Sequence, residues 1–383
     1  MSLLRDLPAS PPAMLAAFGD EALLRAALDF ETALARAQAE VGLIPATAAD
    51  AIAEACARPL DVETLAQEAA HAGTLAIPLV NALRGRLPSD VAPWLHKGAT
   101  SQDLADTALM LQAKAGSGLV RAEGARLSDA LAILAERHAA TPMLGRTLLQ
   151  PALPITFGLK VAGWLRGLDA ALARFEAEQA AAIRLQLGGA AGTLAGLDGQ
   201  GQAVAERMAA LLDLPASGTP WHAQRDGVAG LASSLAILVG AVGKIAGDIA
   251  LLAQAEVAEA FEPRVTGRGG SSAMAHKRNP TACQVALSAA VRAPHLAATA
   301  VSALAFQQHE RGLGGWQAEG PVLADLFQLA HGALCAMAPV VEGLEVDADR
   351  MAANLTAAEV GTDLGEAETL VARALAEHRK KDR

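Results

Sequence analysis

An unbroken apolar seam between residues 228 and 252 constrains the fold more than any other feature of this sequence. Its eight residues alternate spacings of three and four, the pattern of a heptad seam: Val228, Leu231, Leu235, Leu238, Val242, Ile245, Ile249 and Leu252. Ile237, Val239 and Leu251 lie off the seam, so other faces of the helix are apolar too. We expect a long helix surrounded by other helices, including helices from other copies of the chain.

The rest of the chain also favours helices. Hydrophobic residues make up 52% of the sequence and charged residues 19%, which argues against a disordered chain. Aromatic residues are only 3% and Tyr is absent, whereas Ala and Leu dominate, and no stretch shows strand alternation. We therefore predict an all-α fold. It includes one long helix over 104–139 and a proline-containing loop over 145–160 that leads into a helix ending near Leu187.

Charge and cysteine content exclude several classes of function. A net charge of −10 with few aromatics is unfavourable for nucleic-acid binding. The most apolar stretch, 235–253, contains Lys244 and Asp248 one helical turn apart, so we expect a buried bundle helix and no membrane association. The three cysteines are far apart and form no CxxC pair, which indicates core thiols of a cytoplasmic protein.

No sequence motif indicates a cofactor or a metal. The glycine-rich stretch 188–201 lacks a preceding strand, so a dinucleotide site is not expected there. Gly243 and Lys244 lie inside the apolar helix and cannot form a phosphate loop. The sequence has no HExxH and no cluster of His with Cys. We predict neither a cofactor nor a bound metal.

The segment GRGGSSAMAHKRNP, residues 267–280, has the clearest chemical character in the chain. It combines flexible glycines, two serines and several basic residues, and we expect it to lead into a helix that starts at Asn279-Pro280 and ends at Pro294. Helix N-termini favour anions, and Lys277 and Arg278 add positive charge. The segment therefore predicts a seat for a carboxylate or phosphate. From these residues alone, the alternative is a solvated basic loop.

This segment resembles the signature GSSxMPxKxNP of the fumarase/aspartase superfamily. Ala275 replaces the usual proline, and seven positions match: Gly270, Ser271, Ser272, Met274, Lys277, Asn279 and Pro280. Three further segments resemble the superfamily's first substrate-binding turn, its second motif and its glycine loop, in that order: HKGATSQDLADT (96–107), GRTLLQPALPITFG (145–158) and GGAAGT (188–193).

The resemblance implies a fold, an assembly and a reaction. The implied fold is all-α in three parts, which we place at 1–103 for an N-terminal helical domain, 104–345 for a central long-helix bundle and 346–383 for a short C-terminal segment. Relatives usually carry a larger final domain. The implied assembly is a homotetramer in which each active site draws on three subunits, and no cofactor is needed.

Two segments favour one branch of the superfamily. PWHAQRD (220–226) and HERGLGGWQAEG (309–320) are most similar to bacterial 3-carboxy-cis,cis-muconate cycloisomerases, with adenylosuccinate lyase as the nearest competitor. The implied substrate is a small tricarboxylate. The implied reaction interconverts 3-carboxy-cis,cis-muconate and 4-carboxymuconolactone. In it, a carboxylate of the substrate adds across the substrate's own double bond.

Leu148 distinguishes a cycloisomerase from a lyase. Lyases of the superfamily usually have a His directly after the Thr of the second motif, where it serves as general acid, but here Thr147 is followed by Leu148. A lactone opens to a carboxylate whose acid has a pKa of about 4, so it leaves without protonation. Two alternatives stay open: a lyase whose acid has moved to His96 or His71, and a non-catalytic helical assembly protein.

The resemblance also implies roles for individual residues. Ser271 is expected to be the base that removes the proton beside a carboxylate, or returns it on lactonisation. Lys277 and Asn279 are expected to bind that carboxylate and to stabilise an enolate-like intermediate. The remaining expected substrate-binding residues are His96, Thr100, Ser101, Gln102, Arg146, Gln150 and Arg311. For His96 and Arg311 the alternative is a satisfied polar residue at a helix junction.

Overall fold

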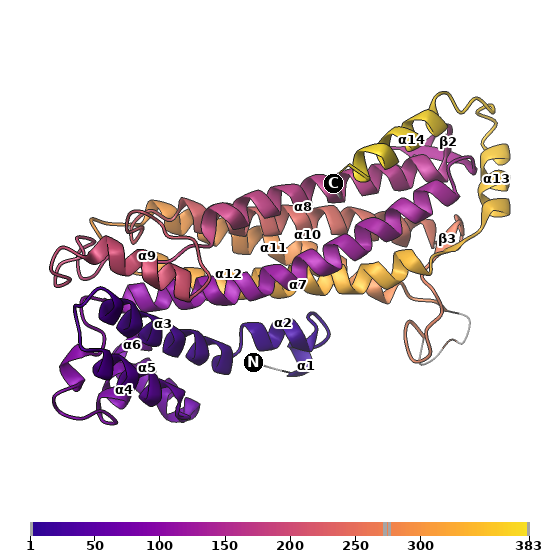
Figure 1. The fold of residues 1–383 in the computed structure, drawn as a ribbon. Coiled ribbons are helices and arrows are strands. Elements are labelled where there is room, and N and C mark those ends of the chain that lie inside the picture. Colours follow the sequence, from indigo (N-terminus) through magenta and orange to yellow (C-terminus); the bar gives the residue numbers. More distant parts are fainter. Residues whose placement is uncertain (1–2, 271–273, 275–276, 381–383) are drawn as a thin grey trace.

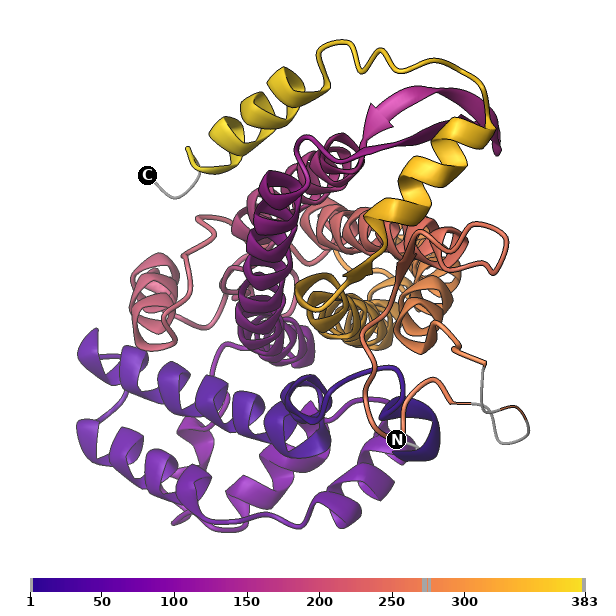
Figure 2. The same cartoon turned by 90° about the vertical axis from the view of Figure 1, so that its right-hand side faces the viewer.

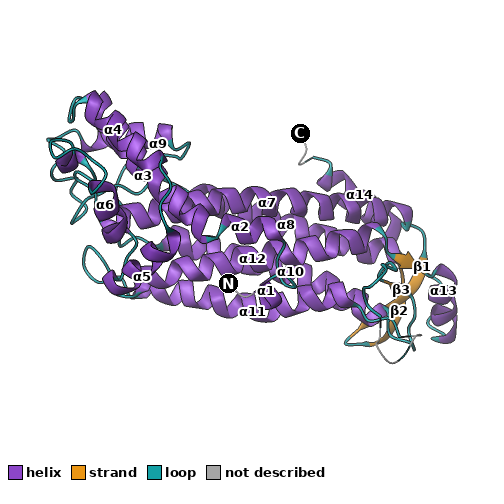
Figure 3. Ribbon diagram, turned by 90° about the horizontal axis from the view of Figure 1, so that it is seen from below, coloured by secondary structure: helices purple, strands orange, loops and turns teal. Residues whose placement is uncertain are grey.

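The computed structural model describes residues 3–270, 274 and 277–380. Its main body is a bundle of long helices that run side by side (Figures 1 and 3). These are α7 (Ser101–Arg137), α8 (Phe157–Ala182), α10 (Asp226–Leu252), α11 (Thr281–Ala305) and α12 (Gly315–Glu342). The all-α prediction is confirmed in its main outline, because helices dominate and the strands are few and short.

Shorter helices cover the two ends of the bundle. At the end where α7 begins lie α1 (Leu3–Asp6), α2 (Pro12–Ala17), α3 (Asp20–Glu40), α4 (Ala46–Ala57), α5 (Val62–Ala72), α6 (Ala76–Arg84), a 3-10 turn (Ala92–Trp94) and α9 (Gly201–Leu211), with α1 and α2 lying toward the middle of the bundle. At the other end lie the strands β1 (Pro142–Thr147), β2 (Gln150–Thr156), β3 (Ala260–Phe261) and β4 (Glu345–Val346), with α13 (Ala348–Ala357) and α14 (Ala367–His378).

The seam predicted from the sequence forms the buried face of α10. All eight of its residues are buried, because α10 packs against α8, α11 and α12. By length and composition α10 and α12 could each cross a membrane. However, 50% of the most apolar 18-residue stretch of α10 and 67% of that of α12 are buried inside the structure. Both are therefore core helices of the bundle.

α7 sets the distance between the two ends of the molecule. It is a single helix of 37 residues, as predicted, and its glycines do not interrupt it. At 1.5 Å per residue it spans about 55 Å. The turn just before α7 and the β1–β2 hairpin just after it therefore lie at opposite ends of the bundle (Figure 1).

Two local predictions were wrong. The loop expected over 145–160 is an antiparallel hairpin, in which β1 pairs with β2 from Pro142↔Thr156 to Thr147↔Gln150. Each strand has only one partner, so a proline can take a position that needs no N–H bond. The helix expected to stop at Pro294 continues through it to Ala305. Pro294 is exposed, away from the packed face of α11.

The hydrophobic core consists of two clusters. The larger fills the bundle and reaches the C-terminal helices, and the smaller joins α3, α4 and α6 to residues 185–209. Residues 185–209 thus pack with the N-terminal helices, although they follow the first two bundle helices in sequence. The three-part division at residues 103 and 345 stays a prediction.

A buried ion cluster links three bundle helices near the start of α7. The Arg225 guanidinium donates to both carboxylate oxygens of Asp106 at 2.8 Å each, and its Nε donates to Glu319 at 3.0 Å. Burial raises the pKa of Glu319, although the hydrogen bond and charge of Arg225 oppose this. Removing one partner would leave a buried charge uncompensated, so the cluster fixes the register of α7, α10 and α12.

The short C-terminal segment is attached to the bundle by a polar cluster. Nδ1 of His378 lies 3.2 Å from Asp169, and Nε2 lies 3.4 Å from Asp129. Figure 2 shows α13 and α14 together with the β1–β2 hairpin on one side of the molecule. The segment thereby covers the end of the bundle where the hairpin lies.

Candidate active site

The predicted site residues fall into two groups at opposite ends of the chain's fold. At the start of α7 lie His96, Thr100, Ser101, Gln102 and Arg311, and at the far end lie Arg146, Gln150, Lys277 and Asn279. Ser271 lies outside the described residues. In the first group Arg311 contacts Thr100, and in the second Lys277 and Asn279 line one pocket.

Asp103 organises the first group. Thr100 is the N-cap of α7, and its backbone N–H donates to Asp103 Oδ2 at 2.9 Å in a capping box. The fully buried carboxylate also accepts the N–H groups of Gly188 and Gly189, each at 2.9 Å, and lies 2.7 Å from Nε2 of His222. The glycine loop is therefore fastened to the turn that starts α7.

Arg311 closes this arrangement into a ring of hydrogen bonds. Its Nη1 donates to Thr100 Oγ1 at 3.0 Å, and its Nη2 donates to the carbonyls of Gly189 at 3.2 Å and Ala190 at 3.0 Å. Its Nε is buried and has no partner among the described residues. Such a donor suits a substrate oxygen or a water, because an unmet buried N–H is costly.

Two neighbours of Thr100 differ in exposure. Ser101 is half-buried, at the first position of α7. Gln102 is fully buried, and its Nε2 donates to the carbonyl of His222 at 3.0 Å. In this structure Gln102 supports the segment around His222, and its contact with a substrate stays a prediction.

His96 is paired with a buried carboxylate. Its Nδ1 lies 2.6 Å from Oε1 of Glu31, a residue of α3 that is 1% exposed. Burial lowers the pKa of His96, but the charge and hydrogen bond of Glu31 outweigh it, so the net shift is upward; Asp103 adds to the rise and Arg84 opposes it. Beside the Thr100 turn, the imidazole of His96 therefore binds a proton more readily than a free histidine does. His71, the other histidine considered as an acid, is exposed at the end of α5.

The His96–Glu31 pair should make stability depend on pH. Because the folded-state pKa of His96 is raised, the pair contributes fully below about pH 6.5, its unfolded value, and the contribution is lost as pH rises through the folded value. Between pH 6 and pH 9 the wild type should lose more free energy of unfolding than a Glu31→Gln variant. Urea melts at each pH measure this, and equal losses in the two proteins would contradict it.

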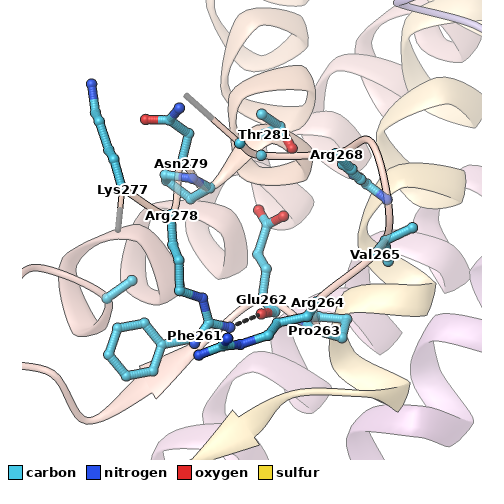
Figure 4. A pocket seen from close by; sticks show the side chains of 14 residues that line it. Phe261, Glu262, Pro263, Arg264, Val265, Arg268, Lys277, Arg278, Asn279 and Thr281 are labelled. Atoms are coloured by element: carbon cyan, nitrogen blue, oxygen red, sulfur yellow. Dashed lines mark hydrogen bonds between the residues drawn. The ribbon is translucent and has the colours of Figure 1, made fainter. Parts of the chain in front are cut away.

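Two residues of the second group, Lys277 and Asn279, line a basic pocket before α11. A cavity of about 180 Å³ is lined by residues on both sides of the serine loop, among them Arg264, Arg268, Lys277, Arg278 and Asn279. Figure 4 shows the side chains of Lys277 and Asn279 extending to the same side. The backbone N–H of Asn279 donates to the Gly269 carbonyl at 2.9 Å, so the two ends of the loop are held together.

Glu262 occupies the helix N-terminus that the sequence predicted as an anion seat. The N–H of Cys283 donates to its Oε1 at 2.8 Å, and the N–H of Ala282 donates to its Oε2 at 3.2 Å. The first turn of α11 is therefore already bound to the protein's own carboxylate. A substrate carboxylate at this pocket would rely on the side chains of Lys277 and Asn279 instead.

Arg146 and Gln150 lie on the hairpin. The Arg146 guanidinium forms two hydrogen bonds to Glu259, at 2.8 and 2.9 Å, and Glu259 is fully buried. The charge of Arg146 is thus compensated inside the chain. Gln150 is exposed next to the hairpin turn. Substrate contact by either residue stays a prediction.

Sequence reasoning gave no role to four residues that build these groups: Glu31, Asp103, His222 and Glu262. The TSQD sequence at 100–103 has capping-box spacing, so the position of Asp103 was readable. The other three residues are hydrogen-bonded to partners far away in sequence, so no local sequence pattern indicated their roles. Among the described residues, no three His, Cys, Asp or Glu side chains cluster to hold a metal ion.

Comparison with known proteins gives matches over most of the chain. A family model described as "lyase" matches residues 8–294. A 3-carboxy-cis,cis-muconate cycloisomerase of Bradyrhizobium diazoefficiens is 48% identical over 372 residues, which is 96% of this chain and 81% of the relative. A nitrosuccinate lyase of Streptomyces davaonensis is 43% identical over 366 residues, covering 92% of this chain and 76% of the relative.

A solved structure matches along its whole length. The crystal structure of 3-carboxy-cis,cis-muconate lactonizing enzyme from Pseudomonas putida superposes with a TM-score of 0.92 at 37% identity, and the match covers 100% of both chains. The short C-terminal segment is therefore also present in a chain of known structure.

Proposed function

The chain belongs to the lyase family of the fumarase/aspartase superfamily, and from its similarity to cycloisomerases we propose that it is an enzyme interconverting 3-carboxy-cis,cis-muconate and 4-carboxymuconolactone. The observation that supports this most is similarity to cycloisomerases at 48% identity over 96% of the chain. The reaction is an intramolecular addition: a substrate carboxylate oxygen bonds to an alkene carbon, and the neighbouring carbon takes up a proton. It needs no cofactor.

The hairpin turn has no proton-donating side chain, which agrees with this reaction. Leu148 stands where lyases of the superfamily have a histidine acid, and no titratable group replaces it within the two-residue turn Leu148–Leu149. Lactone opening releases a carboxylate, a weak base that needs no proton donor. A second candidate is a lyase that breaks a carbon–nitrogen bond, favoured by the likeness to the nitrosuccinate lyase.

Each group of site residues is assigned one end of the tricarboxylate. Lys277 and Asn279 bind the carboxylate next to the carbon that gains or loses a proton, and Ser271 transfers that proton. Positive charge at Lys277 stabilises the enolate-like intermediate. Thr100 and Arg311, with His96 beside them, bind a second carboxylate. Ser101, Gln102, Arg146 and Gln150 complete the assigned set.

The separation of the two groups supports a shared site. α7 keeps them about 55 Å apart in one chain, far more than a small tricarboxylate can span. Neighbouring chains packed in antiparallel fashion would bring opposite ends together. We assign the protein a homotetramer whose sites are each built from more than one subunit.

Exposed faces of α10 and α11 suit this packing. α11 exposes a stripe with spacings of four and three: Leu287, Val291, Pro294, Ala298, Val301 and Ala305. On α10, Ile237 and Leu251 are exposed on a face that also includes Gly240 and Gly247, which allow close helix approach. These stripes have the spacing of a coiled-coil seam, and the described part of the chain does not cover them. The free cysteines Cys56, Cys283 and Cys335 suit a cytoplasmic location.

The activity can be tested directly by ultraviolet absorbance. Adding enzyme to 3-carboxy-cis,cis-muconate should remove the conjugated-diene absorbance without releasing fumarate, and the product should be 4-carboxymuconolactone by NMR. A wild-type protein that leaves this absorbance unchanged but releases fumarate or nitrite from a succinyl or nitro substrate would establish the lyase instead. Inactivity on all of these would favour a non-catalytic assembly protein.

A further inference from the structure

The turn of the β1–β2 hairpin has an unfavourable backbone for its residues. Thr147 pairs with Gln150, so Leu148 and Leu149 form a two-residue turn, and their φ angles are 52° and 63°. Two positive φ angles are the mark of a type I′ turn, which favours Asn-Gly because side chains clash there. Leucine has no polar atom with which to stabilise this conformation locally. Nothing in the folding of the hairpin itself therefore favours two leucines.

The side chains of this turn gain nothing from burial. Leu148 is 96% exposed and Leu149 is 73% exposed. Most exposed apolar residues need no explanation, but here exposure coincides with backbone strain at two successive positions. Strain that persists without a local benefit points to a role that the single chain does not show.

The opposite end of the molecule has a matching feature. Leu313 is 88% exposed, two residues from Arg311 and just before α12 begins. Arg311 is bonded to Thr100, so Leu313 lies beside the first group of site residues. Leu148 and Leu149 lie beside Arg146 and Gln150 of the second group. Each half of the assigned site thus exposes apolar side chains next to its polar ones.

We propose that Leu148 and Leu149 of one chain pack against Leu313 of a second copy and form the apolar wall of the shared site. The proposal rests on the shared site of the proposed function and names the surfaces that meet there. The substrate has a hydrocarbon diene between its carboxylates, and this wall suits the diene because it offers neither charge nor a proton. The strained turn is retained because an Asn-Gly turn would fold more easily but would present polar atoms.

Disulfide trapping tests the contact without any substrate. A Leu149→Cys chain and a Leu313→Cys chain, mixed and oxidised mildly, should give a cross-linked dimer on a denaturing gel. Leu149 lies in the hairpin turn at one end of the bundle and Leu313 lies near the Thr100 turn at the other end, so a bond between them joins two copies. Leu370→Cys, at another exposed leucine on α14, is the matched control and should not cross-link with Leu149→Cys. Oligomers that form without this cross-link would overturn the proposed contact.

A pair of turn variants tests the need for apolar side chains. Leu148→Asn/Leu149→Gly suits the turn and should fold, yet it should lower kcat/KM at least about thirtyfold because the wall is lost. Leu148→Met/Leu149→Met keeps the strain and the apolar character, and should stay within about threefold of wild type. Glu359→Gly, which relieves a positive φ of 54° elsewhere, should leave activity unchanged. An Asn-Gly variant as active as wild type would overturn the proposed wall.

Discussion

Ser271→Ala is expected to lower turnover by at least about a hundredfold while leaving the fold intact, because it removes the group assigned to proton transfer. Ser271 lies in sequence between Gly269 and Asn279, which are hydrogen-bonded at 2.9 Å, so the loop that contains it begins and ends at one place. Lys277 and the other basic residues of this pocket would stabilise a serine alkoxide, which is otherwise far too weak an acid to form.

The matched control for this variant is Ser272→Ala. This variant removes the hydroxyl oxygen of the neighbouring serine, and it should retain most of the activity. Initial rates at saturating substrate give kcat for each variant, and circular dichroism reports the fold. If Ser271→Ala turns over at a near-normal rate, Ser271 has no part in the proton transfer, and Ser272 becomes the residue to examine.

The spacing of apolar residues predicted the helix bundle, because helices pack into a bundle through faces with that spacing. The spacing of the seam from Val228 to Leu252 survives in the structure as the buried face of α10. The long helix α7 was also predictable, because good helix formers outweigh its three glycines, Gly116, Gly118 and Gly124. Regular helices with one apolar face leave a clear pattern in a sequence.

The hairpin left no such pattern. Its strands contain Pro142, Pro151 and Pro154 and pair with only one partner each, so neither alternation nor β-branched enrichment was required. Its function was partly readable, since the superfamily motif includes it. The strain at Leu148 and Leu149 was not readable, because φ angles follow from the pairing register.

The site was predictable as a set of motifs and not as a set of contacts. Thr100 and Lys277 followed from the signature segments. The partners that fix these segments, such as Glu31 for His96 at a separation of 65 residues, depend on how helices pack. Glu262 shows the consequence most clearly, because an anion seat inferred from the helix start is bound to a carboxylate from another segment.

The distance between the two groups of site residues predicts a second large effect. Mixing two inactive variants should recover activity. Thr100→Val removes the hydroxyl that accepts from Arg311 and caps α7, and it should be nearly inactive, as should Ser271→Ala. In one chain the Thr100 turn and the Gly269–Asn279 hydrogen bond, which brackets Ser271 in sequence, are separated by the length of α7, which is about 55 Å. In the proposed shared-site model, each site therefore takes its Thr100 turn and its serine loop from different copies.

Co-refolding the two variants in equal amounts should restore activity to about a quarter of wild type, because random assembly gives that fraction of sites an intact Thr100 from one copy and an intact Ser271 from another. Differently tagged chains purified in series verify that mixed oligomers form, and each variant refolded alone supplies the baseline. The readout is loss of the diene absorbance. Mixed oligomers that form but stay as inactive as their parents would place Thr100 and Ser271 in the same subunit's site. The shared-site model would then be wrong.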